Sequence, residues 1–221
     1  MKVYKLILLR HGQTGYNASS CMQGQLDIKL SNLGYKQAIL SAKLITKCYP
    51  NRIISSNLKR ALETGKLIGV YTKILVNIDK RLNETNLGKW QGIDSQNIDA
   101  VNASSRLIWQ SNSIWKPPKG ESQIDVAKRS INVVDELVNT SLKWCILQNS
   151  LNQNQFTIVV ITHGGIITAL VAKLINLSAK HWFMLCGVEN AKWVQLSGYY
   201  KASTTNSKKI IWKLNQWNVS I

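Results

Sequence analysis

The chain has 221 residues, of which 45% are hydrophobic and 18% are charged, and its formal net charge is +17. This length and balance exclude a disordered chain and predict one globular domain over residues 1–221 with a substantial buried core. No segment is suited to span a membrane. The best apolar candidate, Ile166 to Ile175, is too short and contains Lys173.

The amino-terminal segment and the cysteines both favour a cytoplasmic protein. The amino-terminal stretch starts basic and turns apolar, but Arg10 interrupts it before a signal-peptide core is complete. The four cysteines are far apart and form no CxxC pair: Cys21, Cys48, Cys145 and Cys186. Their spacing predicts reduced thiols rather than a zinc site or a redox pair.

The positive charge raises the hypothesis of a nucleic-acid-binding protein or a non-catalytic scaffold. The lysines are scattered, however, and no run of five basic residues occurs. We find no zinc-finger, KH or RRM signature, so no specific nucleic-acid partner is expected. The charge would still help to attract a small polyanionic substrate, in a salt-dependent way.

Apolar runs and helix signals alternate along the chain, which is typical of an α/β protein. The first strand, at Lys5–Leu9, leads into a polar loop that contains Asn17 and Gln23. Ser31 is a candidate N-cap for a helix that extends to about Cys48. The later expected elements are a strand at 53–56, a helix opening at 57–64, a weak strand at 74–76, a loop-rich excursion around 109–120, a helix at 121–147, a polar loop at 149–155, a strand at 157–162, a helix at 164–177, strands at 193–196 and 210–214, and a polar loop at 202–209.

Two of the three histidines follow buried-type strands directly and precede glycine, at His11-Gly12 and His163-Gly164. Parallel strands present their carboxyl ends at one edge of a sheet, where α/β proteins bind ligands. Each glycine also allows a ligand to approach the backbone closely. One such histidine would be read as structural, but two in the same context predict that both imidazoles face one anionic ligand.

Two further residues have a functional and an ordinary interpretation. Arg60 falls in the first turn of a helix, where it would grip an anion beside the free backbone N–H groups or simply extend into solvent. Glu84 lies in an irregular segment before a glycine-tryptophan turn. There it could act as a general acid, or it could be an ordinary surface carboxylate. The local pattern alone leaves both pairs of alternatives open.

Five segments in order resemble the histidine phosphatase superfamily, also called the phosphoglycerate mutase-like family, with its RHG signature. They are Leu9-Arg10-His11-Gly12-Gln13-Thr14-x-x-Asn17, Ser56-x-Leu58-x-Arg60-Ala61-x-x-Thr64, Leu82-x-Glu84-x-x-x-Gly88-x-Trp90-x-Gly92, Gly120-Glu121-Ser122 and Thr162-His163-Gly164-Gly165. The resemblance implies a three-layer α/β/α sandwich around a mainly parallel sheet, with the active site at its carboxyl edge. It also implies a histidine acid-type phosphatase or a related phosphotransferase.

The same resemblance assigns roles to particular residues. His11 would be the nucleophile that forms a phosphohistidine, and Glu84 would be the general acid. The implied catalytic residues are Arg10, His11, Arg60, Glu84 and His163, and the implied substrate-binding residues are Arg10, Asn17, Gln23, Arg60, His163 and Gly164. No metal is expected, since arginines and histidines would supply the positive charge. A homodimer is compatible with the resemblance, because dimers occur in this superfamily.

Stretches outside the shared signature are similar to actinobacterial glucosyl-3-phosphoglycerate phosphatases, among them Glu84–Gly92 and Asn190–Gly198. The expected substrate is therefore glucosyl-3-phosphoglycerate or a related small phosphorylated metabolite, with no cofactor. The alternative is a phosphoglycerate mutase that depends on 2,3-bisphosphoglycerate. Against it, the region Gln91–Gly120 lacks the Arg-Arg-Ser element of longer mutase inserts, and Gln13-Thr14 replaces the usual Glu-Ser.

Overall fold

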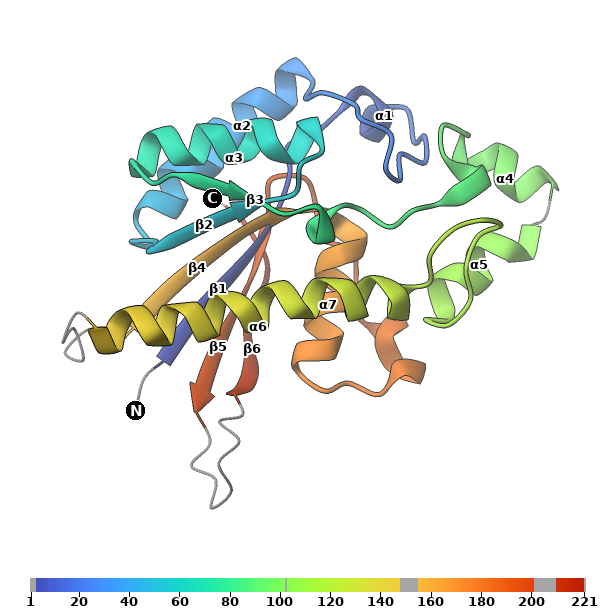
Figure 1. Cartoon of the computed structure of the whole chain (residues 1–221). Coiled ribbons are helices and arrows are strands. Elements are labelled where there is room, and N and C mark those ends of the chain that lie inside the picture. The colour runs from blue at the N-terminus through green and yellow to red at the C-terminus, as the bar shows by residue number, and fades with distance from the viewer. Residues whose placement is uncertain (1–2, 102, 148–154, 201–209, 221) are drawn as a thin grey trace.

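A six-stranded sheet forms the centre of the computed structural model, which describes residues 3–101, 103–147, 155–200 and 210–220. The strands lie in the order β3-β2-β4-β1-β5-β6 (Figure 1). Their bounds are β1 (Val3–Arg10), β2 (Arg52–Ser55), β3 (Val76–Ile78), β4 (Gln155–Thr162), β5 (Trp193–Tyr200) and β6 (Ile210–Val219). The first four strands in the sheet order are parallel, whereas β5 and β6 pair antiparallel. The prediction of a mainly parallel sheet is confirmed.

Helices lie on both faces of the sheet (Figure 1). The α-helices are α1 (Gly15–Ala18), α2 (Asn32–Thr46), α3 (Lys59–Thr72), α4 (Ser95–Val101), α5 (Ala103–Ser111), α6 (Gln123–Leu147) and α7 (Gly164–Leu174), and the 3-10 helices are η1 (Lys80–Leu82), η2 (Gly88–Trp90) and η3 (Ala179–Met184). None of the helices in the described ranges is long and apolar enough to cross a bilayer.

The strand β1 shows why both faces are covered, because its apolar side chains alternate between two cores. Leu6 and Leu8 pack into the cluster that contains residues of α6 and α7. Ile7 and Leu9 pack into the cluster that contains residues of α2 and α3. All four side chains are fully buried. The apolar run therefore specifies a central strand with a helix layer on either side, as the three-layer prediction requires.

Two predicted elements differ from the structure. The strand expected at 74–76 begins only at Val76, because the Ile74 N–H donates to the Gly69 carbonyl and completes the end of α3. The helices α4 and α5, which have seven and nine residues, were not predicted, although residues 112–120 of the expected loop-rich excursion do form a loop. Helices this short leave little periodicity in the sequence. The polar loops expected at 149–155 and 202–209 fall almost wholly outside the described residues.

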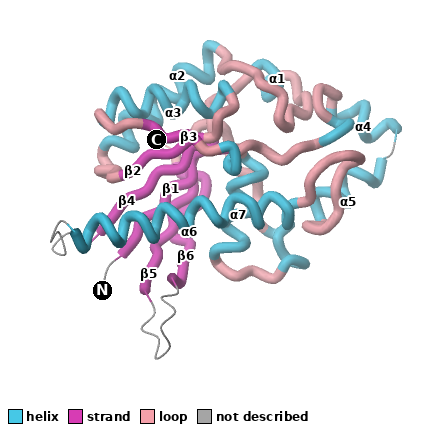
Figure 2. Tube along the Cα trace, in the orientation of Figure 1, coloured by secondary structure: helices cyan, strands magenta, loops and turns pink. Residues whose placement is uncertain are grey.

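The parallel strands end at a common level. Arg10 on β1 pairs in register with Thr162 on β4, and Ser55 on β2 pairs with Ile161. The residues that follow these strands therefore emerge side by side. Figure 2 shows long loop segments gathered between this edge of the sheet and helices α1, α4 and α5. This edge holds the two His-Gly segments.

The first turn of α2 touches the backbone of the loop after β1. Ser31 caps the helix by accepting from the Gly34 N–H at 3.0 Å, as predicted. A Cβ on Gly34 would lie 2.0 Å from the Gln13 carbonyl oxygen, and a Cβ on Gly12 would lie 2.3 Å from the Gly34 carbonyl oxygen. Two glycines therefore face each other across a contact that admits no side chain.

We expect Gly34→Ala to lower the free energy of unfolding by about 2 kcal/mol. The forced backbone shift costs about 3 kcal/mol, and alanine in a helix returns only about 1 kcal/mol relative to glycine. Urea unfolding measures the difference. Gly15→Ala is the matched control, because nothing lies within 4 Å of the added Cβ. Equal stability of the two variants would contradict the close contact.

Candidate active site

A cavity of about 190 Å³ opens at the carboxyl edge of the parallel strands. Six of the predicted site residues line it: Arg10, His11, Asn17, Gln23, Arg60 and Glu84. His163 lies directly behind the His11 ring, with ring centroids 5.1 Å apart. Gly164 lies against the Arg10 guanidinium, and the next residue, Gly165, reaches the cavity wall. Segments that are more than 150 residues apart in sequence thus meet in one place.

His11 leaves β1 with one ring nitrogen tied to the backbone. Its Nδ1 lies 2.7 Å from the Gly12 carbonyl oxygen, and since a carbonyl can only accept, Nδ1 carries the proton. Nε2 is therefore unprotonated, and it accepts from Arg60 Nε at 3.2 Å. Burial, reinforced by Arg60 and Arg10, holds the pKa of His11 well below its usual value. The imidazole is consequently neutral at neutral pH, with Nε2 available as a nucleophile.

Arg60 is almost entirely buried, which excludes the alternative of a solvated arginine. Its Nη1 and Nη2 donate to the carbonyl oxygens of Leu26 and Gly24 at 2.8 and 2.7 Å. These contacts fix the plane of the guanidinium beside His11. Burial lowers the pKa of Arg60 to about 10, opposed by the charge of Glu84, so the side chain stays charged at neutral pH.

Arg10 supplies a second guanidinium. Its Nη1 donates to the Val188 carbonyl oxygen at 2.6 Å, whereas its buried Nε has no acceptor within the described part of the chain. Burial lowers the pKa of Arg10, and the charges of Glu84 and Glu189 oppose this shift. A buried N–H that lacks a protein acceptor is unfavourable unless a ligand supplies one. Arg10 is therefore suited to bind an anion beside His11.

His163 is fully buried and held by a chain of hydrogen bonds. Its Nε2 lies 2.8 Å from the Ser56 hydroxyl, which in turn donates to Asn83 Oδ1 at 2.8 Å. Its Nδ1 is buried with no partner among residues that the structure describes. Burial, followed by the charge of Arg60, keeps the pKa of His163 well below its usual value. Nδ1 is thus the ring atom left for a ligand.

Glu84 faces the cavity rather than open solvent. Its Oε1 accepts from the Thr85 N–H at 2.8 Å, and its Oε2 accepts from the Gly165 N–H at 3.2 Å. The ion pairs formed by the described residues do not include Glu84. Its carboxylate is therefore oriented by backbone donors and is not bound to an arginine, an arrangement that leaves it able to exchange a proton with a ligand.

Asn17 and Gln23 line the cavity from the segment expected to be a loop, part of which forms the one-turn helix α1. Thr14 caps α1, and its hydroxyl lies 2.9 Å from Gln23 Oε1. Asn17 Oδ1 accepts from the Thr14 N–H at 3.1 Å and from Asn190 Nδ2 at 3.2 Å. These hydrogen bonds hold the two amide oxygens in place, and each side chain also has an N–H₂ group that can donate to a ligand.

The far wall of the cavity is apolar. It contains Met22, Leu87 and Trp109, and the Trp109 ring packs edge-on against Trp90 with centroids 6.0 Å apart. The sequence predicts that the excursion marked by Trp109 closes over a site, but Trp109 lies on α5 and not on a loop. The cavity therefore has a cationic end at the sheet and an apolar end under α5.

Comparison with known proteins gives the family. Residues 6–209 match the family model of the histidine phosphatase superfamily, branch 1. The chain belongs to the histidine phosphatase superfamily. This membership confirms the fold and the enzyme class that the five motifs predicted. No group of three or more His, Cys, Asp or Glu side chains that could hold a metal occurs in the residues described for this histidine phosphatase.

Three similar proteins are informative. This histidine phosphatase is 43% identical over 220 residues to a glucosyl-3-phosphoglycerate phosphatase of Mycobacterium tuberculosis, covering 100% of this chain and 96% of the relative. It is 27% identical over 183 residues to a metal-independent phosphoserine phosphatase of Arabidopsis thaliana, covering 80% and 71%. The mycobacterial glucosyl-3-phosphoglycerate phosphatase in complex with inorganic phosphate superposes with a TM-score of 0.87 at 42% identity, covering 98% and 97%.

Proposed function

We propose that the chain hydrolyses phosphomonoesters without a metal, through a phosphohistidine on His11. The observation that carries the proposal is the state of His11. The Gly12 carbonyl holds the proton on Nδ1, and Arg60 donates to the unprotonated Nε2. A neutral nucleophile therefore lies against a guanidinium, where the oxygens of a phosphoryl group would be stabilised during in-line attack.

In the first step His11 Nε2 attacks phosphorus and the bond from phosphorus to the ester oxygen breaks. Arg10 and Arg60 stabilise the non-bridging oxygens through their guanidinium N–H groups, and His163 donates from Nδ1 once its ring takes up a second proton on binding the phosphoryl dianion. Glu84, as the carboxylic acid, gives its proton to the departing oxygen. The products of this step are the free alcohol, the phosphohistidine and the Glu84 carboxylate.

In the second step water attacks the same phosphorus. The Glu84 carboxylate takes a proton from the water, and the bond from phosphorus to Nε2 breaks. Inorganic phosphate leaves and His11 returns to the neutral tautomer held by Gly12. Asn17, Gln23 and the start of α7 at Gly164 complete the binding site. The residues present supply charge and a nucleophile, so no metal enters either step.

We propose glucosyl-3-phosphoglycerate, or a related small phosphorylated metabolite, as the substrate. The support is the similarity over the full length to a phosphatase for that compound. The cavity also fits an ester of this kind, since its cationic end can hold the phosphoryl group while Gln23 and the wall near Trp109 contact the organic part. We propose further that residues 1–221 act as one domain, since the first and last strands, β1 and β6, belong to one sheet.

A turnover assay in EDTA tests this function. It compares glucosyl-3-phosphoglycerate, p-nitrophenyl phosphate, and 3-phosphoglycerate with and without 2,3-bisphosphoglycerate. We expect the fastest phosphate release from the glucosyl compound and no loss of rate in EDTA. A rate restored only by added metal would contradict metal independence. Formation of 2-phosphoglycerate that depends on the bisphosphate would identify a mutase instead.

A further inference from the structure

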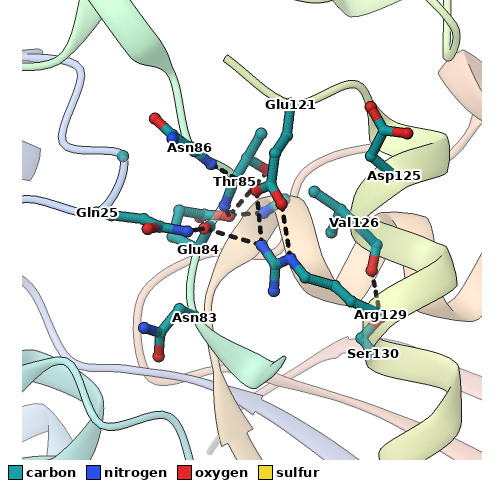
Figure 3. A network of polar contacts seen from close by, with 12 residues as sticks. Gln25, Asn83, Glu84, Thr85, Asn86, Glu121, Asp125, Val126, Arg129 and Ser130 are labelled. Carbon is teal, nitrogen blue, oxygen red and sulfur yellow. Dashed lines mark hydrogen bonds and ion pairs between the residues drawn. The ribbon is translucent and has the colours of Figure 1, made fainter. Parts of the chain in front are cut away.

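Arg129 is the centre of a polar network behind Glu84 (Figure 3). From α6, its Nη2 donates to the Glu84 carbonyl oxygen at 3.0 Å, and its Nη1 donates to the Arg81 carbonyl oxygen at 2.7 Å. The guanidinium thereby holds the backbone on both sides of Asn83. Neither contact involves the Glu84 carboxylate, so Arg129 acts on the position of Glu84 without touching the cavity.

Glu121 fixes the guanidinium in this place. Its two carboxylate oxygens accept from Arg129 Nε and Nη2, each at 2.9 Å, in a bidentate pair. The oxygen that faces Nη2 also accepts from the Asn86 N–H at 2.8 Å. The side chains of Arg129 and Glu121 are 21% and 25% exposed, so solvent screens the pair only partly.

A second side chain holds the Glu84 carbonyl from the opposite direction. Gln25 Nε2 donates to this oxygen at 3.0 Å (Figure 3). Gln25 N in turn donates to Gln91 Oε1 at 2.7 Å. The carbonyl therefore receives two donors from segments that are about 100 residues apart, and the segment 84–86 has little freedom to move.

From these contacts we infer that Arg129 is a positioning residue for Glu84, and that the Arg129–Glu121 pair sets where the carboxyl group stands relative to the leaving oxygen. The inference rests on the proposed function, in which Glu84 is the general acid. A proton donor must lie within hydrogen-bond reach of the departing oxygen, and a displacement of about 1 Å can lower a rate by about 100-fold. Loss of Arg129 then affects the esters that need protonation and spares those that do not.

The test is the leaving-group dependence of Arg129→Met. This variant keeps an unbranched side chain of about the length of the arginine stem and removes all the guanidinium donors. We expect kcat/KM to fall by about 10- to 100-fold for an alkyl phosphate such as glycerol 3-phosphate. For p-nitrophenyl phosphate, whose phenolate leaves without protonation, we expect a change below about threefold. Glu121→Gln weakens the same pair and should show the same split to a smaller extent.

Arg81→Met is the matched control. Arg81 also joins the segment around η1 to α6, but its guanidinium donates to Asp79 and Glu136. We expect kcat/KM for both substrates to stay within about twofold of the original value, since the hydrogen bonds of the Arg81 guanidinium go to Asp79 and Glu136 and Arg81 is outside the cavity lining. Thermal unfolding of each variant shows whether the fold persists. If Arg129→Met does not fold, the same two substrates are compared in Arg129→Lys and Glu121→Gln.

The variant Glu84→Gln separates failure of this inference from failure of the proposed function. Suppose that Glu84→Gln shows the leaving-group split. If Arg129→Met then lowers kcat/KM equally for both substrates, or for neither, the positioning role is wrong. If Glu84→Gln shows no split, the general-acid role itself is wrong. In the double variant Glu84→Gln/Arg129→Met we expect no loss beyond that of Glu84→Gln alone, because the two changes remove one function.

Discussion

Replacement of His11 by alanine is expected to abolish turnover and any covalent phosphoenzyme. The loss of kcat should reach about four orders of magnitude or more, the scale seen when an enzymatic nucleophile is removed. The reason is structural, since His11 Nε2 is the unprotonated nitrogen that meets Arg60 in the cavity. Rapid quench with substrate labelled in the phosphoryl group should give an acid-labile labelled protein for the original chain and none for the variant.

His181→Ala is the matched control, because His181 is the third histidine and lies on η3, outside the cavity lining. It should retain both turnover and label. His11 is buried, so thermal unfolding of His11→Ala must show a folded protein before its inactivity is interpreted. Near-normal phosphate release by a folded His11→Ala protein would rule out the covalent mechanism.

For Glu84→Gln we expect a loss that depends on the leaving group. The amide is of equal size but has no acidic proton to donate. Hydrolysis of sugar and alkyl phosphates should slow by about 100- to 10,000-fold, the usual contribution of general acid catalysis. Formation of the phosphoenzyme from p-nitrophenyl phosphate should slow by less than about tenfold. Steady-state kcat/KM for a series of esters with leaving groups of graded basicity measures this dependence.

Glu63→Gln provides a carboxylate control. Glu63 Oε2 accepts from the Leu30 N–H at 2.9 Å, so it resembles Glu84 in binding a backbone donor, but it lies outside the cavity lining. We expect that any effect of Glu63→Gln on kcat/KM is the same for all esters and does not depend on the leaving group. Equal slowing of alkyl and nitrophenyl esters by Glu84→Gln would refute the acid assignment.

Much of the site could be predicted because its residues come directly after strands that the sequence pattern identifies clearly. The central runs of the two strands that precede His11 and His163, residues 6–9 and 158–161, are apolar throughout, since both strands are buried on two faces. Parallel strands then bring their carboxyl ends together without further information. Ser56 follows β2 at the same edge and contacts His163, but it was not among the predicted site residues.

Other parts of the site cannot be predicted from local sequence patterns. The Gly12 carbonyl that sets the His11 tautomer is a backbone atom, which no residue type encodes. The pairing of Arg129 with Glu121 and the Glu84 carbonyl joins segments up to 45 residues apart. One signal for Arg129 was present in the sequence. It lies three residues after Val126 and four before Val133, so a cation borders the buried stripe of α6.

The position of β1 in the sheet also bears on how the protein is made. Both neighbours of β1 come late in the chain, as β4 (Gln155–Thr162) and β5 (Trp193–Tyr200). At a synthesis rate of roughly 5 to 20 residues per second, β4 leaves the ribosome roughly 7 to 30 s after β1. During this time the apolar segment at residues 6–9 has neither of the strands with which it pairs in the sheet. A nascent chain that stops before residue 163 lacks the second His-Gly segment, so the candidate site forms only after β4 and the start of α7 have emerged.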